Sequence, residues 1–118
     1  MEEISKEHLS LAGEYAVASE LCKRGIYAQL TLGTRKKTDL LVDTRTGMLR
    51  IQVKAKQVGS WTCRGVFGED IVLVLVDYKN KGLDQRPDFY ILTSSDWDKF
   101  VRWFLSDYII AEKVKLDD

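Results

Sequence analysis

One run of six consecutive apolar residues, Ile71 to Val76, constrains the fold of this chain more than any other feature. A short run without a polar residue is typical of a β-strand whose two faces are both covered. It is far shorter than the roughly 20 apolar residues that a membrane-spanning helix needs. We therefore expect an internal strand of a sheet here, with other elements packed on both sides of the sheet.

The segments around this strand predict the order α-β-β-β-β-β-α. Apolar residues recur at helical spacing from Glu7 to Arg24, and Gly25 follows where a C-terminal cap belongs. The five predicted strands cover residues 26–31, 38–43, 48–57, 71–76 and 88–92. The first three should be antiparallel, and a last helix with an apolar stripe should begin at Ser95. We expect an α/β fold with a mixed central sheet flanked by helices.

The length of 118 residues, of which 45% are hydrophobic, is enough for one core, so we expect a single domain over residues 1–118. The start of the chain is acidic where a signal peptide would be basic, which favours a cytoplasmic protein. Cys22 and Cys63 should then be reduced thiols that pack as small apolar groups.

Histidine and cysteine chemistry is largely excluded. His8 is the only histidine, and the two cysteines do not form a CxxC pair. These facts argue against His/Cys zinc sites, haem ligation and catalysis by a triad with a central histidine. A metal ion, if the protein binds one, must be held by oxygen ligands.

Basic residues are concentrated in one part of the chain, although 18 Lys and Arg balance 18 Asp and Glu overall. Residues 35–64 contain eight basic residues and only Asp39 and Asp43 as acids, a net charge of +6, so the remainder is −6. Such a division can present one basic face to a polyanion. The candidate nucleic-acid contacts are Arg35, Lys36, Lys37, Arg50, Lys56 and Trp61. Alternatively, the charges lie on solvated strand edges and turns, and Trp61 packs in the core.

Glu14 is a carboxylate on the apolar face of the first predicted helix. The apolar residues of that face stand three, four and seven positions away from it: Leu11, Val17, Ala18 and Leu21. Burial of an ionised acid costs several kcal/mol unless a cation or a hydrogen-bond donor meets it. Glu14 is therefore either paired with a structural Arg or Lys or part of a functional site.

Three further polar residues converge on one face of the predicted sheet. Apolar and polar residues alternate over residues 50–56, so Gln52 and Lys54 share a face. A four-residue hairpin loop over residues 44–47 would pair Asp43 with Met48. By the same register, Asp39 would lie opposite Gln52.

Oxygen ligands beside an ammonium group suit phosphodiester hydrolysis. Asp39, the amide oxygen of Gln52 and Glu14 can hold Mg²⁺, or Mn²⁺, with water in the remaining positions. Lys54 can orient or deprotonate the attacking water and offset the charge on the pentavalent phosphate. The four residues are therefore our candidate catalytic group.

Three motifs lie between residues 7 and 57: Gly13-Glu14 followed by Gly25, Thr38-Asp39-Leu-Leu-Val42, and Ile51-Gln52-Val53-Lys54. Together they resemble the PD-(D/E)XK nuclease superfamily. Within it, they are similar to a small branch with a QxK core found in certain intron-encoded homing endonucleases, and more loosely to archaeal Holliday junction resolvases. The resemblance implies a restriction-endonuclease-like, three-layer core.

The resemblance also implies a role for each of the four residues. Glu14 corresponds to the acid of the first helix, Asp39 to the metal-binding aspartate, Gln52 to the acidic position of the (D/E)xK element and Lys54 to its lysine. Thr38 replaces the proline, which shapes the turn without taking part in the chemistry. Gln52 places a neutral amide where a carboxylate is usual, which should weaken Mg²⁺ binding.

The sequence thus predicts a metal-dependent endonuclease that hydrolyses phosphodiester bonds in DNA, with no membrane association. A homodimer would supply two cuts in a duplex. Two alternatives stay open. One is a catalytically inactive nuclease fold that binds nucleic acid, and the other is a protein-interaction module without nucleic-acid contact.

Overall fold

The first helix begins at a side-chain cap and ends at a glycine. In the computed structural model, α1 (Lys6–Lys23) has Ser5 as its N-cap, and the Ser5 hydroxyl accepts a hydrogen bond from the backbone N–H of His8 at 3.3 Å. Gly25 follows the helix with a φ of 81°, a conformation that glycine adopts without strain. The predicted helix is confirmed, with each end one residue earlier than expected.

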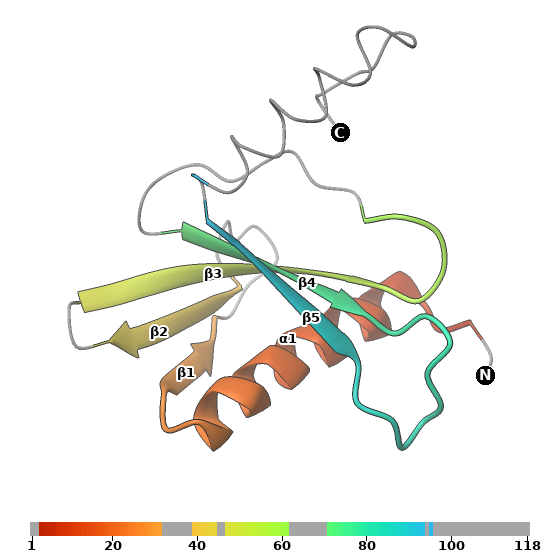
Figure 1. Ribbon diagram of the computed structural model, residues 1–118, viewed down its shortest axis with the longest axis horizontal. Helices are drawn as coiled ribbons and strands as arrows, with labels where there is room; N and C mark the ends of the chain where they lie inside the picture. The colour runs from red at the N-terminus through yellow and green to blue at the C-terminus, as the bar shows by residue number, and fades with distance from the viewer. Residues whose placement is uncertain (1–2, 32–38, 45–46, 62–70, 94, 96–118) are drawn as a thin grey trace, which may run out of the picture.

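The structure describes residues 3–31, 39–44, 47–61, 71–93 and 95. Five strands follow α1 in the predicted order (Figure 1): β1 (Tyr27–Leu30), β2 (Leu40–Thr44), β3 (Gly47–Lys56), β4 (Ile71–Asp77) and β5 (Asp88–Thr93). The predicted last helix, apart from its first residue Ser95, lies outside the described residues. Among those that are described, no helix is long and apolar enough to cross a membrane.

The strands form one mixed sheet in the order β1-β2-β3-β4-β5. β3 pairs with β4 in parallel, and all other neighbours are antiparallel. Asp43 pairs with Met48 as predicted, but Thr44 also pairs with Gly47, so the hairpin is tighter than a four-residue loop. The expectation of a mixed α/β fold is confirmed.

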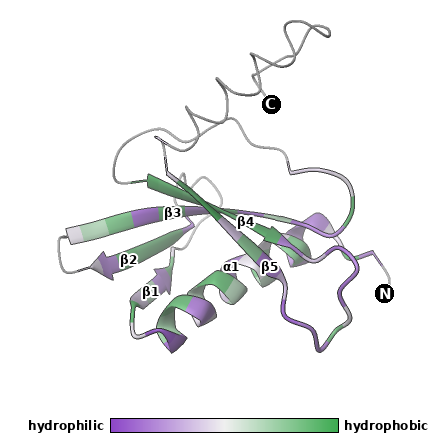
Figure 2. Cartoon of the chain, in the orientation of Figure 1, coloured by the Kyte–Doolittle hydropathy of each residue, from purple (hydrophilic) through white to green (hydrophobic). Residues whose placement is uncertain are grey.

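The expectation of an internal strand with two buried faces is also confirmed. β4 is paired along both of its edges, with β3 on one side and β5 on the other. Leu73 and Val74 are adjacent and therefore face opposite sides of the sheet, yet they are only 0% and 4% exposed. Figure 2 shows apolar residues concentrated in the strands and hydrophilic ones in the link between β4 and β5.

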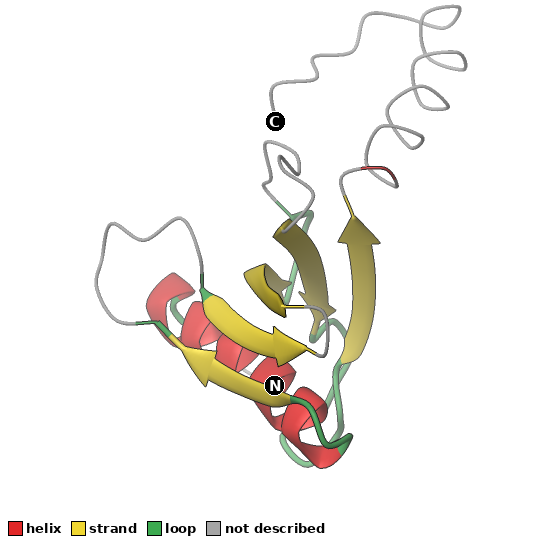
Figure 3. Ribbon diagram, turned by 90° about the vertical axis from the view of Figure 1, so that its left-hand side faces the viewer, coloured by secondary structure: helices red, strands yellow, loops and turns green. Residues whose placement is uncertain are grey.

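The main core lies between α1 and one face of the sheet (Figure 3). Its buried residues are Val17, Leu40, Val42, Ile51, Val53, Val74 and Val76. At Gly13 the helix comes so close to β3 that an added Cβ would lie 2.8 Å from the Cβ of Ala55. Leu11, expected on the buried face of α1, is 47% exposed because it lies at the margin of a face centred on Gly13, Glu14 and Val17.

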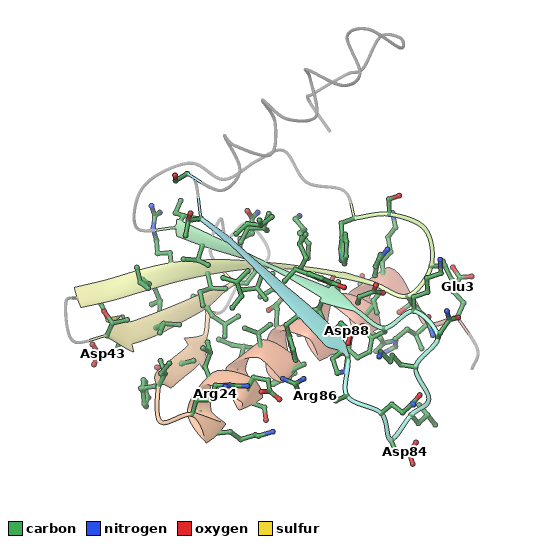
Figure 4. The ribbon with its side chains drawn as sticks, viewed as in Figure 1. Glu3, Arg24, Asp43, Asp84, Arg86 and Asp88 are labelled. Atoms are coloured by element: carbon green, nitrogen blue, oxygen red, sulfur yellow. The ribbon has the colours of Figure 1, made fainter. Side chains whose placement is uncertain are left out.

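The C-terminal end of α1 carries an ion-pair cluster. The carboxylate of Glu20 accepts a hydrogen bond from Arg86 Nε at 2.8 Å and lies 3.2 Å from Lys23 Nζ and 3.5 Å from an Arg24 nitrogen. Figure 4 shows Arg24 and Arg86 at this end and Glu3 at the opposite end of the helix. The hydrogen bond from Arg86 is the main cause that lowers the pKa of the Glu20 carboxyl from 4.5 to about 2.

Candidate active site

An open pocket of about 430 Å³ lies beside the part of β3 that extends beyond β2. The last pair between these two strands is Leu40 with Ile51, whereas β3 continues to Lys56 and stays paired with β4 along its other edge. The pocket is lined by this part of β3 and by the N-terminal half of α1. The pocket therefore opens where α1, the start of β2 and the free edge of β3 meet.

All four residues of the candidate catalytic group line this pocket: Glu14, Asp39, Gln52 and Lys54. Glu14 comes from α1, Asp39 directly precedes β2, and the other two lie on β3. Glu14 is buried, with 7% of its surface exposed, whereas Gln52 and Lys54 are half-buried. The structure thus brings the four side chains to one place. Their roles as catalytic residues and metal ligands stay predictions.

The backbone of β3 holds the carboxylate of Asp39. The N–H of Val53 donates a hydrogen bond to Asp39 Oδ2 at 2.7 Å, and the N–H of Asp39 donates to the carbonyl oxygen of Ile51 at 2.9 Å. Because Leu40 pairs with Ile51, the next step of the register puts Asp39 beside Gln52. The backbone of Asp39 is therefore paired with β3, and its carboxylate is held at the edge of β3 by a main-chain N–H, whose position does not depend on a side-chain rotamer.

The turn of α1 that carries Glu14 is anchored from two sides. Gly13 permits the close approach to Ala55, and the hydroxyl of Tyr78, directly after β4, donates to the carbonyl oxygen of Ala12 at 3.1 Å. Burial raises the pKa of Tyr78, so the hydroxyl stays protonated and able to donate. Both contacts are made by the two residues that directly precede Glu14, so they fix the backbone from which its side chain reaches into the pocket.

Gln57 closes the pocket where the chain enters α1. This side chain is 7% exposed, and its Oε1 accepts a hydrogen bond from the backbone N–H of Ile4 at 2.9 Å. The sequence analysis missed this contact, although a signal was present. In the alternation of β3, position 57 belongs to the face of the apolar residues at 51, 53 and 55, so a polar side chain there needs a partner. No comparable pattern pointed to Tyr78.

The pocket is polar, and its charged groups balance. It is lined by three carboxylates and three lysines: Glu3, Glu14, Asp39, Lys6, Lys54 and Lys56. Within the residues that the structure describes, no hydrogen bond or ion pair engages the Lys54 ammonium group.

The pocket offers an oxygen-only set of donors for a metal ion. In the described part of the chain, no three His, Cys, Asp or Glu residues cluster closely enough to hold one. Glu14 and Asp39 supply two carboxylates, and Gln52 adds an amide oxygen. This set fits Mg²⁺, which binds through one or two carboxylates and keeps several waters.

Of the predicted nucleic-acid contacts, three lie outside the described residues and three lie within them. Arg35, Lys36 and Lys37 lie outside the described residues, and Arg50 is half-buried on β3. Lys56 also lies on β3, but its ammonium group donates to the carbonyl oxygen of Gly59 at 3.1 Å and lies 3.9 Å from the carboxylate of Asp77.

Trp61 is tied into the fold beside Lys56. The Lys56 ammonium group lies 4.2 Å from the centre of the Trp61 ring and covers one of its faces. The indole N–H donates to the carbonyl oxygen of Val76 at 3.0 Å, and the ring meets Tyr90 edge-on at 5.9 Å. These contacts favour the interpretation of Trp61 as a packing residue over base stacking.

The mixed sheet with α1 against one face is a nuclease-like α/β fold. A bacterial homing endonuclease of known structure, I-Ssp6803I, is similar to this chain with a TM-score of 0.55 and 20% sequence identity. The similarity covers 81% of this chain and 70% of the other. No protein-family model and no curated protein sequence matches the chain. The structural likeness supports the predicted resemblance to homing endonucleases at the level of the fold.

Proposed function

We propose that this protein is a Mg²⁺-dependent endonuclease that hydrolyses phosphodiester bonds in DNA. The observation that carries the proposal is the meeting of Glu14, Asp39, Gln52 and Lys54 in one pocket at the open edge of β3. The fold that the chain shares with a bacterial homing endonuclease supports it independently.

Electrostatics explain why cleavage in this pocket needs a cation. The three lysines of the pocket balance its three carboxylates overall, but Glu14 and Asp39 repel a phosphate at the position where it would react. A divalent cation between Glu14, Asp39 and Gln52 would make the pocket positive. When bound there, Mg²⁺ supplies Lewis acidity and a lower pKa for its water.

The protein's own groups then have separate tasks. Val53 holds Asp39 through its backbone N–H, so this carboxylate needs no reorganisation as the phosphate arrives. Glu14 is held by the anchored turn of α1. The Lys54 ammonium group hydrogen-bonds the attacking water and offsets the negative charge that grows on the phosphate oxygens.

The experiment is a cleavage assay with supercoiled plasmid and linear duplex, in Mg²⁺, in Mn²⁺ and in EDTA. We expect cleavage only with a divalent cation, and a loss of at least 100-fold for Lys54→Ala because an electrostatic donor is removed from the reacting phosphate. Lys23→Ala is the matched control, since Lys23 is 64% exposed at the far end of α1. Cleavage that persists in EDTA, or that survives Lys54→Ala, would contradict the proposal.

One observation favours the second candidate function, a nuclease fold that binds nucleic acid without cutting it. Because Gln52 is neutral, the candidate ligand set contains only two carboxylates, Glu14 and Asp39. The superfamily that the sequence resembles usually has a third acid at the position of Gln52. DNA binding without cleavage under every metal condition would identify this alternative. A homodimer, which would supply two pockets for a duplex cut, is part of the proposal and is tested by sedimentation with and without DNA.

A further inference from the structure

Three residues that line the pocket recur every four positions along α1. They are Lys6, Ser10 and Glu14, so they lie on one side of the helix, one turn apart. The helix rises about 1.5 Å per residue, which separates successive members by roughly 6 Å. That separation is close to the distance between neighbouring phosphates along one nucleic-acid strand.

The first two members, Lys6 and Ser10, have the chemistry that phosphate groups require. Lys6 carries an ammonium group, Ser10 carries a hydroxyl donor, and both are exposed. Lysine and serine side chains are among the usual protein contacts to DNA phosphates. Glu14, one turn further along the helix, belongs to the group proposed to act on the phosphodiester.

The face of the sheet offers less to a phosphate near the pocket. Of the predicted contacts there, Lys56 already has the carboxylate of Asp77, the carbonyl of Gly59 and the ring of Trp61 around its ammonium group. To bind DNA it would have to give up these contacts. Lys6 lines the same pocket from the helix side and is exposed to solvent.

We propose that Lys6 and Ser10 bind two phosphates of the substrate strand, next to the phosphate that is cut beside Glu14 and Lys54. This inference rests on the proposed function, because it places the strand relative to that site. The substrate strand then runs along the N-terminal half of α1, and we call this path past Lys6 and Ser10 the track. Glu3, which also lines the pocket and precedes Lys6, limits the track at its outer end by repelling a further phosphate.

The test is the salt dependence of binding to a fluorescein-labelled 20-base-pair duplex, measured by anisotropy in EDTA so that no cleavage occurs. A protein cation that neutralises one phosphate contributes about 0.9 to the slope of log K against log salt concentration. Lys6→Ala should therefore make this negative slope shallower by about 0.9 and weaken binding several-fold. Lys6→Arg should restore both the slope and the affinity. Ser10→Ala should weaken binding with an unchanged slope, since a neutral hydroxyl releases no counterion.

Lys23→Ala is again the control and should change neither quantity, and helix circular dichroism checks that each variant folds. A Lys6→Ala slope equal to that of the unmodified protein would overturn the inference, as would complete absence of DNA binding. Glu3→Gln should strengthen binding, and no change there would refute the limit at Glu3.

If the unmodified protein cuts DNA but Lys6→Ala leaves the slope intact, only the track fails. If the slope depends on Lys6 but no metal supports cleavage, the endonuclease proposal fails.

Discussion

Gly13 offers a sharp test of how α1 is seated on β3. Alanine in the interior of a helix is normally favoured over glycine by about 1 kcal/mol. Here the new Cβ would lie 2.8 Å from the Cβ of Ala55 and 3.5 Å from Cγ1 of Val53, so the helix must move away from the strand. Overpacking of this kind costs about 1–3 kcal/mol. We therefore expect Gly13→Ala to lower the free energy of unfolding by about 1 kcal/mol, where propensity alone predicts a gain.

The assay is urea unfolding followed by helix circular dichroism, with thermal melting as a second measure. A loss of 1 kcal/mol should lower Tm by about 4 °C in a chain of this size. The matched control is the same substitution in an Ala55→Gly background, where the opposing Cβ is absent. There Gly13→Ala should stabilise by about 1 kcal/mol, a coupling of about 2 kcal/mol between the two positions. If Gly13→Ala stabilises the unmodified protein, the close approach of helix and strand is refuted.

Two further predictions concern charge. Gln52→Glu adds a third carboxylate to the candidate ligand set, so the Mg²⁺ concentration for half-maximal cleavage should fall several-fold, whereas an unchanged or higher requirement would argue against a ligand role. Glu20 has its pKa lowered to about 2 in the folded protein, mainly by its hydrogen bond to Arg86, from 4.5. Its contribution to stability is therefore fully present above pH 4.5 and is lost as pH falls towards 2. Arg86→Ala should remove this part of the acid dependence in urea unfolding measured from pH 6 to pH 2, and an unaltered pH profile would contradict the assignment.

The parts of the site that the sequence predicted are those fixed by local pattern. The alternation over residues 50–56 put Gln52 and Lys54 on one face, and the hairpin set the register that brings Asp39 beside them. Both depend on residues close in sequence, since a strand has a period of two and a short turn leaves few registers. The tighter pairing of Thr44 with Gly47 left the register of Asp43 and Met48 unchanged.

The parts that the sequence did not reveal depend on contacts between distant residues. The parallel pairing of β3 with β4 places Asp77 beside Lys56. The Asp77 carboxylate therefore pairs with a lysine that the sequence analysis expected to contact nucleic acid. The contact between Tyr78 and Ala12 joins residues 66 positions apart, and nothing in either local pattern announces it. Only the folded chain shows which neighbours a side chain has across such distances.

The parallel junction between β3 and β4 also has a consequence for the order of assembly. It separates the chain into a unit that ends with β3 and a β4–β5 hairpin, each built from neighbours in sequence. All four candidate catalytic residues belong to the earlier unit, but Tyr78 belongs to the later one. Because chains fold progressively as they leave the ribosome, the catalytic groups emerge well before the hydroxyl that secures the turn beside Glu14. A truncated product that stops before residue 78 would carry every reactive group yet lack that anchor.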